Sequence, residues 1–563
     1  MTEPVLSIRD LTVEIPTRHG LFLPVKNVTY DIRPGEIRGV VGESGAGKSM
    51  TGNAVIGLLD DPARVASGEV WLNGRRIDNL SVEEKRAIRG GEIGMIFQDP
   101  LTSLNPLFTI GEQLVETIQL HLNVSASEAK ERAIALLDRV SIPDPATRFD
   151  QYPHQFSGGM RQRVVIALAL CSEPSVIVAD EPTTALDVSI QAQVLDLIKE
   201  LAEETQVGVI LVTHDMGVIA DTTEEVTVMY AGEVVESGPT DQVLSTPSHA
   251  YTKSLIAAVP RPQVKLHRFP QVSYGGRETT FKIEDLARNW DKTAPSKSGK
   301  LLEVKGVTKT FIEKNAILPS RRKYFTAVDE VSFDIKDGEV FGLVGESGSG
   351  KSTVARMIAT LYPVDGGQID FDGQDVTAMS PQELGQYRRQ IQMIFQDPFS
   401  SLNPRMKVAS IVAEPLVHHK LLPPAQISGR VQELLDRVGL TRAAGAKYPH
   451  EFSGGQRQRI SIARALATQP RFLICDEPTS ALDVSIQAQI LNILKDLQEH
   501  LRLTMLFISH DLPVVRQMCD RVGVMKHGQL VEVQDTDTLF AKPQHAYTAR
   551  LLELMPRLAQ LAD

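Results

Sequence analysis

The chain is predicted to fold as two tandem α/β domains, each built on a mostly parallel sheet flanked by helices. Three observations predict this fold. The chain has 563 residues, well above the roughly 300 at which a single core stops growing. Several sequence strings occur twice at a similar distance. Short apolar runs also end in glycine-rich loops or acid pairs, as expected of strands buried on both faces of a parallel sheet.

Composition restricts the class of protein. Hydrophobic residues make up 42% of the chain and charged residues 23%, which excludes disordered and fibrous proteins. The net charge of -11 argues against nucleic acid as the main partner. The three cysteines lack any paired ligand spacing, which argues against a disulfide scaffold, a zinc site and an iron–sulfur cluster.

The N-terminal residues lack the basic start and the apolar run of a secretory signal, so we expect a cytoplasmic chain. The longest apolar runs, at 164–171 and 207–212, are too short to cross a bilayer. A function at a membrane would therefore need another, spanning chain.

A duplication runs along the whole chain. The string FSGG occurs at residues 156–159 and 452–455, and FQDP occurs at 97–100 and 395–398. The repeat distance is 303 residues for two loop lysines, 298 for two glutamines and 296 for the later motifs. The fall from 303 to 296 indicates small loop deletions in the second copy, and the constant 296 afterwards indicates a core that both copies share without interruption. We predict a first domain at 1–260, a linker at 261–300 and a second domain at 301–563.

The predicted linker is rich in turn-forming and polar residues. It holds nine Lys or Arg against four Asp or Glu, and we interpret it as a solvated connector rather than a membrane-surface patch. A flexible chain of this length spans roughly 35 Å on average, so the two domains can face each other.

Two glycine-rich loops, at 42–49 and 345–352, match the phosphate-loop pattern GxxxxGK[ST]. Each follows a run that we predict to be a strand, Ile37–Val41 or Val340–Val344. The glycines let successive N–H groups turn toward one anion, and we expect the lysine to reach the β- and γ-phosphates. The predicted nucleotide-binding residues here are Gly42, Ser44, Gly45, Gly47, Lys48 and Ser49, and Gly345, Ser347, Gly348, Gly350, Lys351, Ser352 and Thr353.

Two further apolar runs, at 176–179 and 472–475, end in Asp-Glu pairs. An Asp at such a strand end can hold Mg²⁺ through water, and the next Glu can polarise or deprotonate the attacking water. The glutamine of each FQDP string either completes the set of ligands around Mg²⁺ and the attacking water or is a solvated loop residue. The predicted magnesium ligands are Ser49, Gln98 and Asp180 in the first half and Ser352, Gln396 and Asp476 in the second.

A histidine follows each of these Glu residues by 33 positions. A lone histidine is more often structural than catalytic, but the repeated spacing favours catalysis. A neutral imidazole there could hydrogen-bond the γ-phosphate and the attacking water. The predicted catalytic residues are Glu181, His214, Glu477 and His510.

A Ser-Gly-Gly string precedes a long helical pattern in each half and supplies a second anion-binding helix start. One domain needs only one nucleotide. We therefore expect Ser157 and Gly159, and likewise Ser453 and Gly455, to serve the facing domain.

In this order, the motifs resemble those of the ATP-binding-cassette (ABC) ATPases over both halves, including Ala185-Leu186-Asp187 and Ala481-Leu482-Asp483 before the histidines. A finer resemblance is to the ATPase subunits of dipeptide and oligopeptide importers. It rests on the string SLNP after each FQDP and on the His-Ala-Tyr-Thr tails at 249–252 and 545–548. The resemblance implies two ABC-type P-loop domains, each with a helical subdomain, that use ATP and Mg²⁺.

In such transporters two ATPase domains drive two transmembrane permease subunits, which an extracytoplasmic solute-binding protein supplies. The resemblance thus implies a peripheral protein at the cytoplasmic face of the inner (plasma) membrane that hydrolyses ATP to import peptides or peptide-like solutes and binds no nucleic acid. It also implies a head-to-tail sandwich, in which Ser453 and Gly455 close the Lys48 site and Ser157 and Gly159 close the Lys351 site. Dipeptides, oligopeptides, glutathione-like peptides and opines are all open as solutes.

The first half departs from the family pattern at three nucleotide-binding positions. Met160 stands where the second half has Gln456, and Met50 stands where it has Thr353. Ile15 stands where the second half has Phe311, the residue expected to stack on adenine, unless Phe22 takes that role in the first half. We expect two sites that both hydrolyse ATP but bind it with unequal affinity.

The competing interpretation is a soluble tandem-cassette ATPase that acts on ribosomes or nucleic acid. Such a factor needs a basic, RNA-seeking linker, whereas this linker is only mildly basic. A DNA-repair cassette would carry zinc-type cysteine pairs, which the chain lacks.

Overall fold

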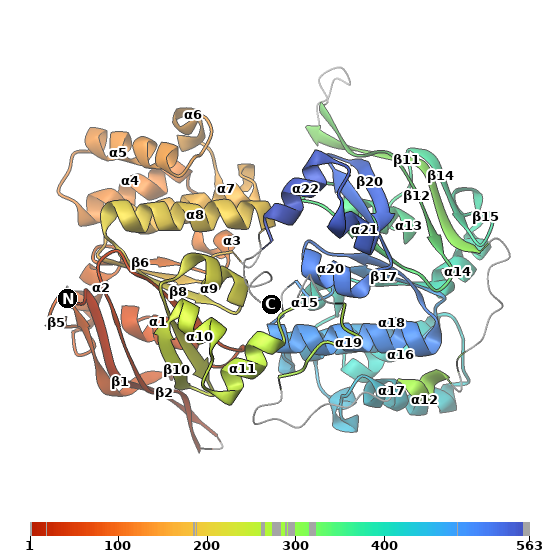
Figure 1. The fold of residues 1–563 in the computed structure, drawn as a ribbon, viewed down its shortest axis with the longest axis horizontal. Coiled ribbons are helices and arrows are strands. Elements are labelled where there is room, and N and C mark those ends of the chain that lie inside the picture. Colours follow the sequence, from red (N-terminus) through yellow and green to blue (C-terminus); the bar gives the residue numbers. More distant parts are fainter. Residues whose placement is uncertain are drawn as a thin grey trace. The chain divides into compact units, whose positions relative to one another are not determined.

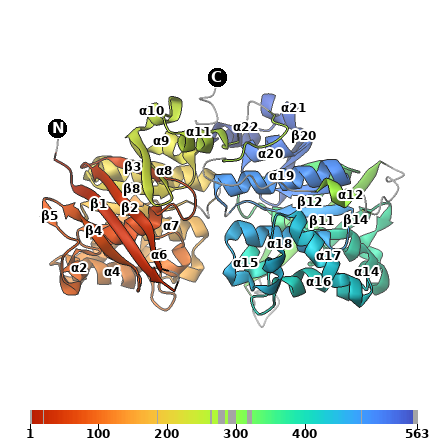
Figure 2. The same cartoon turned by 90° about the horizontal axis from the view of Figure 1, so that it is seen from below.

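The structure is a computed structural model. It describes residues 3–18, 20–183, 186, 188–260, 265–272, 283–287, 290, 299–314, 323–480 and 482–555. Contacts divide the chain into two units, Met1–Val259 and Pro260–Met555. Each unit has its own sheets, helices and hydrophobic cores (Figure 1, Figure 2).

The larger sheet of unit 1 has the strand order β10-β9-β3-β8-β7-β6. All its neighbours pair in parallel except β10, which runs antiparallel to β9 at the edge. Strands β3 and β8 are buried along their whole length, which explains their continuous apolar sequences. The bounds are β3 Ile37–Val41, β6 Ile93–Ile96, β7 Val176–Asp180, β8 Gly208–Thr213, β9 Glu225–Tyr230 and β10 Glu233–Pro239.

A smaller antiparallel sheet of unit 1 has the order β2-β1-β4-β5. Its strands are β1 Leu6–Thr17, β2 Gly20–Ile32, β4 Arg64–Leu72 and β5 Arg75–Arg76. Side chains from both sheets and from α1, Lys48–Ile56, share one core. The remaining helices around the sheets are α2 Val82–Ile88, α8 Val188–Thr205, α9 Met216–Thr222, α10 Thr240–Ser245 and α11 Ala250–Ala257.

A helical subdomain lies between β6 and β7 in the chain. Its helices are α3 Pro100–Ser103, α4 Ile110–His121, α5 Ala126–Arg139, α6 Pro145–Phe149, the 3-10 turn η1 Pro153–Gln155 and α7 Gly158–Leu170. Helix α4 begins at a reciprocal capping box between Thr109 and Glu112. Figure 1 shows α4, α5 and α6 grouped together, and their apolar faces form a second core with α7 and α8.

Unit 2 repeats this architecture, which confirms the predicted duplication of a mostly parallel α/β fold. Its sheets have the orders β16-β17-β18-β13-β19-β20 and β12-β11-β14-β15. The strands are β11 Lys300–Lys314, β12 Lys323–Lys336, β13 Val340–Val344, β14 Gly366–Phe371, β15 Gln374–Asp375, β16 Ile391–Ile394, β17 Phe472–Asp476, β18 Thr504–Ile508, β19 Arg521–Lys526 and β20 Gln529–Asp535. The helices are α12 Glu284–Ala287, α13 Lys351–Ile358, α14 Pro381–Gln390, α15 Pro398–Ser401, α16 Val408–His418, α17 Pro424–Arg437, α18 Gly454–Leu466, α19 Val484–Leu501, α20 Leu512–Met518, α21 Thr536–Ala541 and α22 Ala546–Glu553, with 3-10 turns η3 Val376–Ala378, η4 Arg442–Ala446 and η5 Pro449–Glu451.

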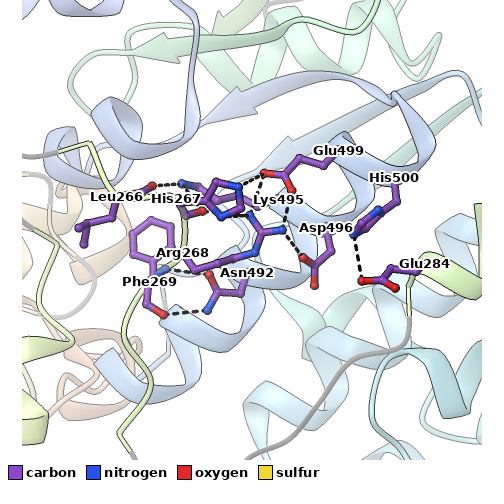
Figure 3. Close-up of polar contacts among 10 residues, drawn as sticks. All are labelled: Leu266, His267, Arg268, Phe269, Glu284, Asn492, Lys495, Asp496, Glu499 and His500. Carbon is purple, nitrogen blue, oxygen red and sulfur yellow. Dashed lines mark hydrogen bonds and ion pairs between the residues drawn. The ribbon is translucent and has the colours of Figure 1, made fainter.

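Part of the predicted linker packs on unit 2. Residues 265–272, which we call the strap, contact α19 through Leu266–Phe269 (Figure 3). The backbone N–H of Phe269 donates to Asn492 Oδ1 and the Asn492 amide donates back to the Phe269 carbonyl, each at 2.9 Å. The guanidinium of Arg268 donates to Asp496 and Glu499 at 2.6 Å each.

Apolar residues of the predicted linker extend this attachment. Phe269, Ile283, Leu286 and Trp290 are 3%, 1%, 1% and 9% exposed and belong to the unit 2 core. The sequence suggested a solvated connector here. The structure differs because these widely spaced apolar residues bury in the unit 2 core, Leu286 from the short helix α12.

Among the helices of the described ranges, none combines the length and the hydropathy that crossing a bilayer requires.

Candidate functional site

The glycine-rich loop of unit 1 lies between the end of β3 and the start of α1. Gly42 and Gly47 have φ of 153° and 99°. A Cβ atom at Gly42 would lie 2.2 Å from the carbonyl oxygen of Met229, and one at Gly47 would lie 2.4 Å from that of Pro24. Only glycine fits these two positions, so the predicted loop is sterically required.

The loop lysine is held in place by backbone carbonyls. Lys48 Nζ donates to the carbonyls of Gly42 at 2.7 Å and Glu43 at 3.0 Å. Lys351 Nζ makes the same bonds in unit 2, to Gly345 at 2.7 Å and Glu346 at 2.9 Å. These lysines are 6% and 5% exposed, so each loop encloses a buried positive charge at a helix start, which suits a phosphate group.

The loop serine reaches the first acid of the Asp-Glu pair. Ser49 donates to Asp180 Oδ1 and Ser352 donates to Asp476 Oδ1, both at 2.9 Å. Burial raises the pKa of both aspartates, and the serine bonds oppose that rise. A hydroxyl and a desolvated carboxylate side by side are a donor set that suits Mg²⁺, whose charge would favour the ionised acid.

The second acid of each pair has an unusual backbone. Glu181 and Glu477 have φ of 48° and 46°, in the left-handed region that non-glycine residues rarely adopt. Their backbone N–H groups donate to Val212 at 2.8 Å and Ile508 at 3.0 Å. The fold therefore imposes this conformation, as it often does at functional residues.

Glutamine and histidine side chains converge on these glutamates. In unit 1, Gln98 Nε2 donates to Glu181 Oε2 at 2.7 Å, and His214 Nδ1 lies 3.0 Å from Glu181 Oε1. In unit 2, Gln396 Nε2 donates to Glu477 Oε2 at 2.8 Å, and His510 Nδ1 lies 3.3 Å from the same oxygen. The structure thus brings together the predicted glutamine, glutamate and histidine of each half.

The charges within the unit 2 group favour an ion pair. Burial pushes the pKa of Glu477 upward, but the hydrogen bond and charge of His510 outweigh it and lower the pKa. Burial likewise disfavours a charged His510, yet the bond to Glu477 raises its pKa. The sequence suggested a neutral imidazole. This geometry instead favours the imidazolium, because the histidine contacts a carboxylate directly.

The Ser-Gly-Gly helix starts differ between the units. Ser157 and Ser453 cap α7 and α18 and accept from the N–H three residues on, at 3.3 Å and 3.4 Å. In α18, Gln456 Oε1 also accepts from the Ser453 N–H at 3.1 Å, and the corresponding Met160 cannot. Neither serine bonds to the glutamine, glutamate or histidine group of its own unit among the contacts of the described residues.

The residues predicted for adenine lie on the smaller sheets. Phe311 on β11 pairs with Phe325 on β12, and Ile15 on β1 pairs with Phe22 on β2. Phe22 and Phe325 are 54% and 53% exposed. Phe311 packs edge-on against Tyr362, with ring centroids 5.5 Å apart. Each unit thus has an exposed phenyl ring on its second strand, Phe22 or Phe325, and unit 2 also has the half-buried ring of Phe311 on its first strand.

Sequence reasoning missed a role for two tyrosines. The backbone N–H of Glu43 in the glycine loop donates to the Tyr251 hydroxyl at 3.1 Å, and that of Glu346 donates to Tyr547 at 3.1 Å. Tyr251 is fully buried and Tyr547 is 8% exposed. Both belong to the repeated His-Ala-Tyr-Thr tails, whose recurrence was the available signal. Of the other quoted motif residues, Ala185, Asp187 and Ala481 lie outside the described residues.

The sequence matches two protein-family models. The "ABC transporter" model matches residues 25–184 and 328–480. The chain belongs to the ABC transporter family. A model of the "Oligopeptide/dipeptide transporter, C-terminal region" matches residues 235–279 and 531–563, which include both tyrosine tails.

Relatives match over nearly the whole chain. The glutathione import ATP-binding protein GsiA of Shigella boydii serotype 4 (strain Sb227) is 45% identical over 561 residues, which cover 98% of this chain and 89% of that protein. GsiA of Escherichia coli (strain K12) is 45% identical over 565 residues with the same coverage. Among solved structures, the dimeric ATP-binding cassette MJ0796 with ADP and Pi is 30% identical, covers 42% of this chain and 99% of its own, and has a TM-score of 0.38.

These matches confirm the predicted resemblance, fold class and activity. The chain is an ATP-binding ABC transporter ATPase of the oligopeptide/dipeptide importer family, and it serves ATP-driven import of peptide-like solutes. An importer ATPase works with a membrane permease. The alternative of a factor acting on ribosomes or nucleic acid finds no support among these matches.

Proposed function

We propose that each unit binds one ATP with Mg²⁺ and that hydrolysis powers uptake of glutathione or a similar short peptide. Two transmembrane permease subunits would form the path, and an extracytoplasmic solute-binding protein would deliver the solute. The chain would bind peripherally at the cytoplasmic face of the inner membrane. The solute class rests on the 45% identity to glutathione import proteins over 98% of the chain.

The single observation that carries the ATPase role is the repeated group of lysine, aspartate, glutamate, glutamine and histidine. In unit 1, Lys48 and the loop N–H groups would bind the phosphates, and Ser49, Asp180 and Gln98 would hold Mg²⁺. The metal would neutralise phosphate charge. In unit 2 the same roles fall to Lys351, Ser352, Asp476 and Gln396.

The glutamates are the proposed bases. Glu181 and Glu477 each keep one carboxylate beside a glutamine and a histidine. That arrangement holds the carboxylate in one orientation and, in unit 2, lowers its pKa so that it is ionised and able to accept a proton from water. His214 and His510 would hold the glutamates and the water in place.

The two units would pair head to tail. Ser453, Gly455 and Gln456 would close the Lys48 site, while Ser157 and Gly159 would close the Lys351 site. Support comes from within each unit, because each has a second anion-binding helix start that its own glutamate group does not use. The domain limits 1–260 and 301–563 belong to this proposal.

The permease contact in unit 1 is proposed to include an apolar surface after the Gln98 loop. Leu107 and Phe108 are 79% and 48% exposed. The Gln98 loop would move as nucleotide binds and leaves. Exposed apolar side chains beside that loop suit contact with a permease surface that has to move with it.

Glu181→Gln with Glu477→Gln tests the ATPase role. The double variant should bind ATP, stay in the closed form and lose hydrolysis, because the proton acceptor is gone. Turnover equal to that of the parent would refute the assigned bases.

Uptake of labelled glutathione, a dipeptide and an opine by the complex reconstituted with its permease and binding protein tests the solute. Lys48→Ala and Lys351→Ala, measured separately, test unequal affinity, and equal residual binding would refute it.

A further inference from the structure

In unit 2, the short helix after Gln396 is joined to the helix that starts at Ser453. The Arg457 guanidinium of α18 stacks on the Phe399 ring of α15, with its Cζ 3.2 Å from the ring centroid. Arg464 Nη1 donates to the Ser401 carbonyl at 2.6 Å, and the hydroxyls of Ser401 and Ser461 lie 3.3 Å apart. We call these three contacts the α15–α18 link.

The link is well anchored at both ends. Arg457 is 7% exposed, and its Nε donates to the Phe452 carbonyl at 2.9 Å, so its guanidinium has little freedom. Ser461 is 1% exposed. On the other side, Asp397 accepts from the Phe399 N–H at 2.8 Å and fixes the start of α15. A stacked guanidinium and a carbonyl bond near opposite ends of α15 allow it little movement relative to α18.

Unit 1 cannot form the same link. With the repeat distances of 298 and 296 residues, Phe399, Ser461 and Arg464 correspond to Leu101, Val165 and Leu168, which offer no ring, hydroxyl or guanidinium. Arg161 corresponds to Arg457, but it donates to the carbonyls of Pro153 at 2.8 Å and His154 at 3.5 Å. The two units therefore differ in how the glutamine loop is attached.

The link connects two parts of the ATP chemistry. Gln396, three residues before Phe399, donates to Glu477 at 2.8 Å. The Arg457 N–H donates to the Ser453 carbonyl at 2.9 Å, in the first turn of α18. A displacement of Gln396 can therefore reach the helix start at Ser453 through the exposed ring of Phe399 and the buried side chains of Arg457 and Ser461.

We propose that the α15–α18 link couples the two ATP sites of the chain, through unit 2 and not through unit 1. This inference rests on the proposed head-to-tail pairing, in which Ser453 closes the Lys48 site while Gln396 serves the Lys351 site. Phe399, Ser461 and Arg464 are then positioning residues. Because coupling between two binding equilibria is reciprocal, the same link acts on both sites.

The test measures the coupling in the full chain. Glu181→Gln and Glu477→Gln provide a background without hydrolysis, and a fluorescent ATP analogue with Mg²⁺ reports binding. The coupling factor is the Kd of the Lys48 site with Lys351→Ala divided by its Kd without that substitution. We expect about fivefold or more in the parent. The combined Phe399→Leu, Ser461→Val and Arg464→Leu variant, which copies unit 1, should bring the factor to within about twofold of unity.

Two matched variants separate coupling from local damage. Phe399→Leu alone, at a residue that is 61% exposed, should lower the factor partly without disturbing the core. Adding Leu101→Phe, Val165→Ser and Leu168→Arg to the combined variant should restore coupling through unit 1. In the Lys351→Ala background, the Kd of the Lys48 site should be the same with and without the unit 2 substitutions.

The outcomes distinguish this inference from the proposed pairing. A parent chain whose sites bind independently would refute the pairing and the link together. A coupled parent whose coupling survives the combined substitution would refute the link alone. Should the combined variant not fold, undiminished coupling in Phe399→Leu would overturn the inference.

Discussion

One amide contributes two hydrogen bonds to the attachment of the strap to α19, and Asn492→Asp tests that contribution. Asn492 is 5% exposed, and both its bonds go to the backbone of Phe269. Aspartate keeps the acceptor for the Phe269 N–H. It loses the donor and brings a carboxylate oxygen against the Phe269 carbonyl. The matching residue of unit 1, 296 positions earlier, is Asp196, which is exposed.

The expected cost follows from these two bonds. Leaving a buried carbonyl without its donor costs about 1–3 kcal/mol, and partial burial of a carboxylate adds to it. A loss of about 2 kcal/mol makes opening of the strap roughly 30-fold more frequent. The ion pairs of Arg268 remain, so the strap should open more often rather than detach.

Hydrogen exchange of the Phe269 amide in the full chain measures this opening. Exchange should be roughly 30-fold faster in Asn492→Asp than in the parent. Asp196→Asn is the control, since no strap bond depends on that exposed residue, and it should leave Phe269 unchanged. Equal exchange in Asn492→Asp and the parent would show that the amide does not hold the strap.

Three further predictions concern the sites. Tyr251→Phe removes the acceptor of the Glu43 N–H and should weaken ATP binding at the Lys48 site about fivefold. Titration with ATP in a Lys351→Ala background measures this affinity. The control Tyr547→Phe in the same background should leave it unchanged. Gly455→Ala places a Cβ 2.2 Å from Ile486 and should lower the Tm of unit 2 by about 2–8 °C. The Cβ of Gly454→Ala would lie 3.4 Å from its nearest neighbour, so this control should change the Tm little. Equal shifts in the two variants would contradict the steric reasoning. The pKa of Glu477 is lowered in the folded protein, so its stabilising effect is present above the ordinary pKa of 4.5 and is lost as the pH falls through the folded-state pKa. The pKa of His510 is raised, so its stabilising effect is full below the ordinary pKa of 6.5 and is lost as the pH rises through the folded-state pKa. The Tm difference between the parent and His510→Gln should therefore be largest between about pH 4.5 and 6.5, and a difference constant up to pH 9 would exclude the ion pair.

The sequence predicted the elements whose limits are set by local chemistry. Strands Ile37–Val41 and Val340–Val344 have the predicted bounds, because each apolar run stops at a glycine loop. The strand after Ser175 extends one residue further than predicted, since Asp180 still pairs with Val212 while its side chain turns to Ser49. The strand ends, the FQDP strings and the 33-residue spacing predicted a glutamate, a glutamine and a histidine for each half, and the three side chains lie together in both units.

Contacts between residues distant in sequence could not be predicted in the same way. Phe269 and Trp290 are isolated apolar residues without periodicity, and their burial depends on side chains of the unit 2 core that lie far away in sequence. The hydroxyl of Tyr251 reaches a backbone N–H 208 positions away, which no local pattern encodes. The charge of His510 depends on its distance to Glu477, whereas spacing alone indicated only that the two residues belong together.

The strap also changes how long the covalent tether between the units is. With the strap bound to unit 2, the chain that leaves unit 1 at Val259 has seven residue steps before Leu266, whose N–H donates to Gln517 and whose carbonyl accepts from Lys495. Seven steps span at most about 25 Å, whatever arrangement the units adopt. A tether this short gives each half an effective concentration of the other in about the millimolar range. Encounter of the two halves is then independent of how many copies of the protein a cell contains.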